Sequence, residues 1–256
     1  MTIDQLYEAL KSIPEADALA LAGSRASGYD DEKSDYDLYV YSDTPISEEK
    51  RSEILLPLCE RAEIGNVYFE SEDNIVVKGG IKADIIYRRL SDIEKVLDYT
   101  LERHMARNGY TTCFWHNVRT SMIVFDKSGR YTKLREKAQC SYPKELKEAI
   151  IKRNMALLTG FLPSYDDQIK KAYSRRDYVS VNHRVSAFLE SYFDVIFAVN
   201  EMTHPGEKRL VQICEKECKI LPENFSENLT KLFENMFRGD VSDIIESIVK
   251  ETEKIV

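Results

Sequence analysis

Residues 21–41 read LAGSRASGYDDEKSDYDLYVY, and this stretch decides which fold the chain is expected to adopt. It overlaps the apolar run Ala18–Ala22, which predicts a buried strand that stops at Gly23. The polar residues 25–34 then predict a turn-rich connection. The next segment, DYDLYVY at 35–41, has the aromatic and β-branched content of a second strand.

Two aspartates, Asp35 and Asp37, lie on that second strand. Residues i and i+2 of a strand point to the same face, with their Cβ atoms roughly 6–7 Å apart. Carboxylates placed in this way repel each other unless a cation bridges them. The pattern therefore predicts oxygen ligands for a hard divalent cation, with coordination positions left for phosphate oxygens and water.

A third carboxylate, Asp84, interrupts the apolar strand predicted over 81–88 (IKADIIYR). An acid inside such a segment is unusual for a β-strand. If this strand lies beside 35–41, three carboxylates meet on one face of a sheet. Two metal ions held there activate an attacking hydroxyl and stabilise a pyrophosphate leaving group.

The turn at Gly23, Ser24 and Arg25 predicts a phosphate-binding segment next to these acids. Glycine at a strand-to-helix turn lets the backbone approach a phosphate closely. The serine hydroxyl and the N–H groups at a helix start then bind phosphate oxygens. Arg25 either adds positive charge at this point or extends into solvent.

Each of these signals has a simpler explanation when it is taken alone. A D-x-D pattern is common in strands, and an acid in a strand also protects a sheet edge from pairing. The ordered combination favours a functional site: an apolar strand, Gly-Ser-Arg, the D-x-D strand and then a further strand that carries Asp84.

This combination resembles the G-S…D-x-D signature of the polymerase-beta-type nucleotidyltransferase superfamily over residues 1–90, and most closely over 17–41. The layout is similar to the small-molecule branch, which includes the kanamycin-, streptomycin/spectinomycin- and lincosamide-type antibiotic enzymes. The resemblance implies transfer of a nucleoside monophosphate from a magnesium-bound triphosphate to a hydroxyl, with release of pyrophosphate. It also implies that Asp35 and Asp37 hold two Mg²⁺ ions. Asp84 would be a further ligand or the general base, and Gly23 and Ser24 would grip the triphosphate.

The rest of the chain predicts an α+β protein: an N-terminal nucleotidyltransferase fold with a mixed sheet and flanking helices, followed by an all-helical bundle. Residues 1–130 are expected to form the catalytic domain and 131–256 a helical acceptor-binding domain. The segment 98–120 carries no assignment. The expected helices are the first one, capped by Thr2 and ended by Pro14, and those at 47–61, 144–160, 165–176, 178–200, 206–219, 223–237 and 240–254; further strands are expected at 66–70, 75–78 and 81–88.

Two residues of the helical half are candidates for the site. Glu190 shares one face of helix 178–200 with His183 and Asp194, away from the apolar stripe. This face either lines a cleft, with Glu190 as the general base, or is solvated; a helical-domain glutamate is the base that the kanamycin-type resemblance implies. Lys208, in the loop before the next helix, either reaches the triphosphate or is a surface cation. The spacing of Arg176 and His183 fits a loose R-x6-H ribonuclease-like pattern that also arises by chance.

Composition limits the class of substrate. The chain has a net charge of −8, and residues 1–120 hold 23 acidic against 14 basic side chains. Binding of long nucleic acid rests on neutralising many phosphates, so the acidic balance disfavours a polymerase and an RNA acceptor. Five scattered cysteines suit a reducing cytoplasm. No long apolar run or secretory leader is seen, so neither a membrane partner nor export is expected.

The sequence therefore predicts a cytoplasmic, ATP-type nucleotidyltransferase that binds a nucleoside triphosphate and a small hydroxylated acceptor, as a monomer or homodimer. Two alternatives stay open: an enzyme that modifies a protein or RNA, as toxin–antitoxin and regulatory members do, and a non-catalytic nucleotide-binding module. Three intact, mutually repelling acids disfavour the non-catalytic module.

Overall fold

The computed structural model describes residues 2–27, 35–160 and 162–256, and its chain forms two compact units. The first unit comprises the residues up to Asp98 together with Asn117–Cys140. The second comprises Tyr99–His116 and Ser141–Val256. The turn-rich connection expected at 25–34 lies outside the described residues from 28 onward. The division into a catalytic domain (1–130) and an acceptor-binding domain (131–256) stays a prediction.

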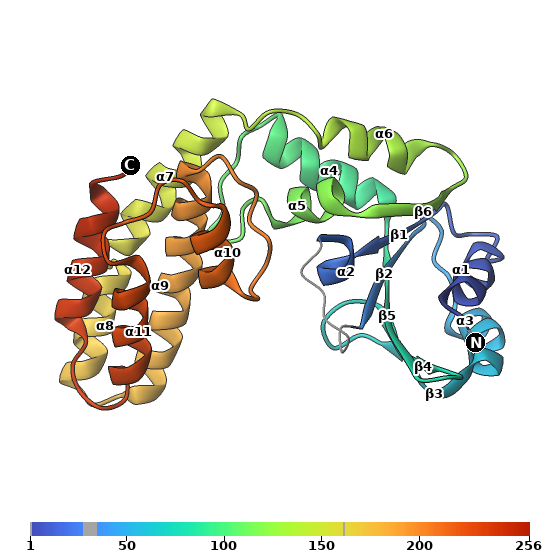
Figure 1. Cartoon of the computed structure of the whole chain (residues 1–256), viewed down its shortest axis with the longest axis horizontal. Helices are drawn as coiled ribbons and strands as arrows, with labels where there is room; N and C mark the ends of the chain where they lie inside the picture. Colours follow the sequence, from blue (N-terminus) through green and yellow to red (C-terminus); the bar gives the residue numbers. More distant parts are fainter. Residues whose placement is uncertain (1, 28–34, 161) are drawn as a thin grey trace. The chain divides into compact units, whose positions relative to one another are not determined.

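A six-stranded mixed sheet forms the centre of the first unit (Figure 1). The strand order is β3-β4-β5-β2-β1-β6, in which β2 and β5 are parallel and every other neighbouring pair is antiparallel. The strands are β1 (Ala18–Ala22), β2 (Tyr36–Tyr41), β3 (Cys59–Asn66), β4 (Glu72–Val77), β5 (Ile81–Arg88) and β6 (Met122–Asp126).

One face of this sheet packs on α1 (Ile3–Lys11) and α3 (Glu48–Leu55) around a buried aliphatic cluster (Figure 1). As predicted, Thr2 precedes α1, and its backbone N–H donates to Gln5 Oε1 at 3.0 Å. Alternation along β2 turns Leu38 and Val40 into this cluster. Asp37, Tyr39 and Tyr41 consequently share the opposite face. The remaining helices of this part of the chain are α2 (Gly23–Ser27), the 3-10 turn η1 (Leu56–Leu58), α4 (Leu90–Leu101), α5 (Cys113–Thr120) and α6 (Arg130–Lys137).

The second unit is built around α9, which contacts α7, α8 and α10. The first half of α9 is amphipathic as predicted, but every residue from Ser191 to Val199 is buried. The predicted helices of this half are confirmed with boundaries shifted by a few residues. They are α7 (Lys144–Leu158), α8 (Tyr165–Ser174), α9 (Tyr178–Val199), α10 (Leu210–Glu217), α11 (Phe225–Asn235) and α12 (Ser242–Glu253). None of the described helices is both long enough and apolar enough to cross a membrane.

Two predicted elements between residues 47 and 70 are wrong. The helix expected over 47–61 ends at Leu55, because Pro57 cannot continue the α-helical hydrogen bonding. Of the strand expected at 66–70, only Asn66 lies in a strand, as the last residue of β3 (Cys59–Asn66), and residues 67–70 form an irregular bend. Its charged, edge-strand composition (CERAEIGN) lacks the alternation that marks a strand.

Candidate active site

The sheet places two of the predicted acids directly beside each other. Strand β2 pairs with β5 in parallel, with Asp37 opposite Asp84. Because laterally paired residues of neighbouring strands point to the same face, both carboxylates lie on the face opposite the aliphatic cluster. The adjacency on which the three-acid prediction depended is therefore present, and both side chains are half-buried.

Asp35 comes one residue before β2 and is also half-buried. Among the residues that the structure describes, no three His, Cys, Asp or Glu side chains gather closely enough to hold a metal ion. The geometry thus shows a pair of carboxylates, and the role of Asp35 as a third ligand stays a prediction. The oxygen donors of the pair suit a hard cation such as Mg²⁺.

Gly23 lies against Asp37. It is the first residue of α2, its φ is +67°, and a Cβ built on it would lie 1.8 Å from Asp37 Oδ2. Only glycine leaves this space and adopts this backbone conformation without strain. The predicted phosphate-binding turn and the predicted metal ligand are hence in direct contact.

The other two residues of the predicted turn differ in what the structure shows. The side chain of Ser24 lies outside the described part of the structure. The guanidinium of Arg25 lies 4.2 Å from the centroid of the Tyr36 ring. Tyr36 belongs to the face of β2 that carries Leu38, opposite the carboxylates. This cation–π contact holds Arg25 on an aromatic partner, and a role in nucleotide binding stays a prediction.

In the second unit, Glu190 is half-buried on α9, and burial raises the pKa of its carboxyl group. A Cβ built on Gly109, whose φ is +77°, would lie 2.8 Å from Glu190 Cβ. The loop that contains Gly109 therefore packs tightly over this position. Lys208 is exposed in the bend that precedes α10. His183 is exposed as well, whereas Glu190 is half-buried, so the residues of the expected polar face differ in their exposure to solvent.

Asp194 shows that the solvated interpretation of this face is wrong at one residue. The side chain is buried, and it accepts hydrogen bonds from Thr111 N at 3.0 Å, Thr111 Oγ1 at 2.6 Å and Asn154 Nδ2 at 3.1 Å. Burial raises its pKa to about 6. Sequence reasoning missed this network because segment 99–116, which supplies Thr111, gave no interpretable periodicity.

A second feature that the sequence did not reveal is the amide next to Asp84. Asn74 lies opposite Asp84 in the antiparallel β4–β5 register, and its Nδ2 donates to Asp84 Oδ1 at 2.8 Å. A single asparagine in a strand carries no signal by itself. An amide in the strand adjacent to an acid is recognisable only once the register is known.

No protein-family model matches the chain, and the curated proteins contain no match to it. Among solved structures, it is similar to a nucleotidyltransferase-like protein from Exiguobacterium sibiricum, at 12% identity and a TM-score of 0.44, over 98% of this chain and 74% of that one. The spectinomycin adenyltransferase from Enterococcus faecialis, solved with ATP and spectinomycin, aligns at 12% identity and a TM-score of 0.33, over 99% and 100%. The CCA-adding enzyme from Thermotoga maritima, complexed with tRNA, aligns at 11% identity and a TM-score of 0.31, over 99% and 80%. Similarity at this level carries no argument about activity, which rests on the residues of this chain.

Proposed function

We propose that the protein is a magnesium-dependent nucleotidyltransferase that moves a nucleoside monophosphate from a nucleoside triphosphate such as ATP to a hydroxyl of a small acceptor. The observation that carries the proposal is the lateral pairing of Asp37 with Asp84, with Gly23 in contact with Asp37. Two repelling carboxylates on one sheet face, beside a glycine turn, are costly for folding alone. They are accounted for by a cation and a phosphate.

Asp35, Asp37 and Asp84 would hold the metal, which when bound neutralises phosphate charge and lowers the pKa of the attacking hydroxyl. The backbone at Gly23 and Ser24 would bind triphosphate oxygens, because glycine allows their close approach. Arg25 and Lys208 would supply positive charge to the triphosphate. For Arg25 this requires that its guanidinium leave the ring of Tyr36.

Glu190 would accept the proton from the acceptor hydroxyl. A general base works best when its pKa lies near the working pH, and burial moves the pKa of Glu190 upward in that direction. The helical unit would provide the acceptor pocket. Because the chain is acidic, we propose a small, uncharged or cationic acceptor rather than RNA. The cysteines of the described chain are free thiols, which fits the reducing cytoplasm.

The test is incubation of the protein with each of the four triphosphates, Mg²⁺ and a panel of hydroxylated acceptors, followed by mass spectrometry for a nucleotidyl increment. Asp37→Asn should lower the transfer rate at least about a hundredfold, because metal-ion charge stabilisation contributes several kcal/mol. Its melting temperature, measured alongside, checks that the variant is folded.

Asp92→Asn is the matched control, because Asp92 is an exposed carboxylate on α4 whose side chain, within the described part of the chain, pairs with Lys95 alone. It should leave transfer unchanged. Transfer by Asp37→Asn at the rate of this control would refute the proposed mechanism. An increment on the protein itself or on added RNA, and none on the small acceptors, would favour the alternative acceptor classes. In the same assay, an unchanged rate for Glu190→Gln would exclude Glu190 as the base.

A further inference from the structure

A chain of hydrogen bonds links the turn after β3 to Asp84. Tyr68 N donates to Asn66 Oδ1 at 2.9 Å, Asn66 Nδ2 donates to Asn74 Oδ1 at 2.9 Å, and Asn74 Nδ2 donates to Asp84 Oδ1 at 2.8 Å. Asn66 Nδ2 also lies 3.2 Å from Glu72 Oε1. Together Asn66 and Asn74 form an amide relay that ends on a candidate metal ligand.

The direction of this relay follows from its first member. A backbone N–H can only donate, so Asn66 must present its carbonyl oxygen to Tyr68 and its NH₂ group to Asn74. Asn74 then has its own carbonyl occupied and must point its NH₂ group at Asp84. The hydrogen bonds from Tyr68 to Asn66, Asn74 and Asp84 thus all run toward the Asp84 carboxylate, and Asn66 Nδ2 is shared with Glu72. Aligned hydrogen bonds of this kind polarise and strengthen one another.

The backbone has an irregularity that makes the relay possible. The β3–β4 register shifts between Glu63 and Asn66, and Gly65, with φ at +81°, lies within the shift. Gly65 N donates to Asp73 Oδ1 at 2.8 Å, and Asp73 is in turn paired with Arg51 in the core. A bulge of this type changes the direction of a side chain, here that of Asn66 toward Asn74. The backbone next to Asn66 is therefore anchored through Gly65 to the buried Asp73, and Tyr68 N in the exposed turn orients the Asn66 amide.

Among the described residues, the bond from Asn74 is the only hydrogen bond to the side chain of Asp84. It fixes Oδ1 and hence the rotation of the carboxylate, so that Oδ2 has a defined direction. Groups that hydrogen-bond to metal ligands orient them in this way, and their loss typically weakens metal affinity about 10- to 100-fold.

We propose that Asn74 is a positioning residue for Asp84, that Asn66 sets the orientation of Asn74, and that the relay prepares the Asp84 carboxylate to bind a divalent cation. This inference rests on the proposed function, because it takes Asp84 to be a metal ligand. It adds to the site two residues that act through Asp84.

The experiment measures Mn²⁺ binding by the loss of the free-ion electron paramagnetic resonance signal, with a non-hydrolysable ATP analogue present. Asn74→Ala should weaken Mn²⁺ binding about tenfold, and Asn66→Ala should weaken it less. Because the two amides act in series, Asn66→Ala should have no further effect in the Asn74→Ala background. In the Asp84→Asn background neither substitution should matter. Ser71→Ala, a neutral and exposed change in the same turn, is the control.

The possible failures can be told apart. If the unsubstituted protein binds no Mn²⁺, or if Asp84→Asn binds it equally well, the proposed metal site fails and the inference fails with it. If Asp84→Asn weakens binding but Asn74→Ala does not, only the inference is refuted. Additive effects of the two asparagine substitutions also refute it, since a purely structural contribution from each would add. If Asn74→Ala does not fold, the Asn66→Ala variant tests the proposal by itself. An Mn²⁺ affinity of Asn66→Ala equal to that of the Ser71→Ala control would then refute the relay.

Discussion

Gly23 adopts φ +67° with its Cα against the Asp37 carboxylate, so a methyl group at this residue faces two obstacles at once. A side chain disfavours the left-handed backbone by about 1 kcal/mol or more. In addition, the new Cβ would lie 1.8 Å from Asp37 Oδ2, so the carboxylate must move. Gly23→Ala should therefore reduce both the free energy of unfolding and the rate of nucleotidyl transfer, measured by urea unfolding and by product mass.

Gly80 is the matched control for that substitution. It has φ +86°, and a Cβ built there meets no atom within 4 Å. Gly80→Ala consequently carries the backbone strain without the clash, and it should lower stability by about 1 kcal/mol while leaving transfer unchanged. Equal losses of activity in the two variants would mean that the contact between Gly23 and Asp37 has no part in the reaction.

Because Asp194 is buried, we expect the free energy of unfolding to depend on pH. Burial raises its pKa from 3.8 to about 6 in the folded protein. The folded state therefore binds the proton more tightly than the unfolded state. The resulting stabilisation is complete below pH 4 and is lost as pH rises through about 6. A shift of this size corresponds to roughly 3 kcal/mol.

The measurement is urea unfolding of the protein and of Asp194→Asn between pH 4 and 7.5. Asp194→Asn should be less stable than the parent at pH 4, because one acceptor oxygen for Asn154 and Thr111 is replaced by a donor. The difference in unfolding free energy should shrink as pH rises through about 6. A difference that stays constant across this range would show that Asp194 does not titrate there.

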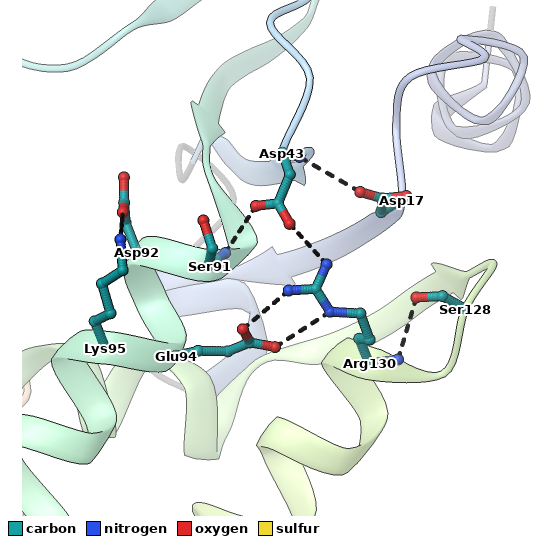
Figure 2. A network of polar contacts seen from close by, with 8 residues as sticks. All are labelled: Asp17, Asp43, Ser91, Asp92, Glu94, Lys95, Ser128 and Arg130. Carbon is teal, nitrogen blue, oxygen red and sulfur yellow. Dashed lines mark hydrogen bonds and ion pairs between the residues drawn. The ribbon is translucent and has the colours of Figure 1, made fainter.

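At the scale of elements, Arg130 joins parts of the first unit that are distant in sequence (Figure 2). Its guanidinium lies 2.7 Å from Asp43 Oδ2 and 2.9 Å from Glu94 Oε2 on α4. Asp43 also accepts a hydrogen bond from Ser91 N at 2.9 Å. Because these side chains are about one-third exposed, Arg130→Ala should cost only about 1 kcal/mol, or 2–4 °C in melting temperature.

The pKa of Asp43 determines the pH at which the stabilisation from Arg130 disappears. The hydrogen bond from Arg130 lowers the pKa of Asp43 to about 2, so the stabilisation is present above pH 4 and lost as pH falls toward 2. The melting temperatures of the protein and of Arg130→Ala should converge over that interval. Lys95→Ala, which breaks an exposed pair with Asp92 drawn in the same view, should change nothing at any pH. A Lys95→Ala effect as large as that of Arg130→Ala would contradict the network.

Elements with a strong local pattern could be predicted from the sequence, and those set by neighbours could not. The strand at Ile81–Arg88 and the helices of the second half were predicted because apolar periodicity and prolines mark them locally. Strand β3 was missed because it is a charged edge strand with a register shift. Asp84 could be recognised as an acid in an apolar strand. Asn74 could not, because its importance depends on which strand lies next to β5.

At the scale of the whole molecule, the chain passes from one compact unit to the other more than once. Residues 99–116 belong to the second compact unit, although 117–140 return to the first. A sequence that is scanned for composition shifts shows only the change near residue 140 and cannot show this return. The segment has little periodicity of its own because its structure comes from distant partners. One example is the pair of Trp115 and Tyr142, whose ring centroids are 5.2 Å apart.

This division predicts which fragments fold. Residues 141–256 alone would retain the buried Asp194 but lose both Thr111 donors, and would also lose the packing of Trp115. Uncovering these groups costs several kcal/mol, a large share of the stability of a domain of this size. We expect fragment 141–256 to give poorly dispersed amide NMR signals and no cooperative melting transition.

A chain in which 99–116 are joined to 141–256 by a flexible Gly/Ser linker should fold cooperatively, because it restores all of these contacts. The same linked chain with Thr111→Val and Trp115→Ala is the control, and it should behave like 141–256 alone. If 141–256 folds cooperatively without the segment, residues 99–116 are dispensable for the helical unit. The second domain would then be defined by the C-terminal sequence alone, as the simple division after residue 130 assumes.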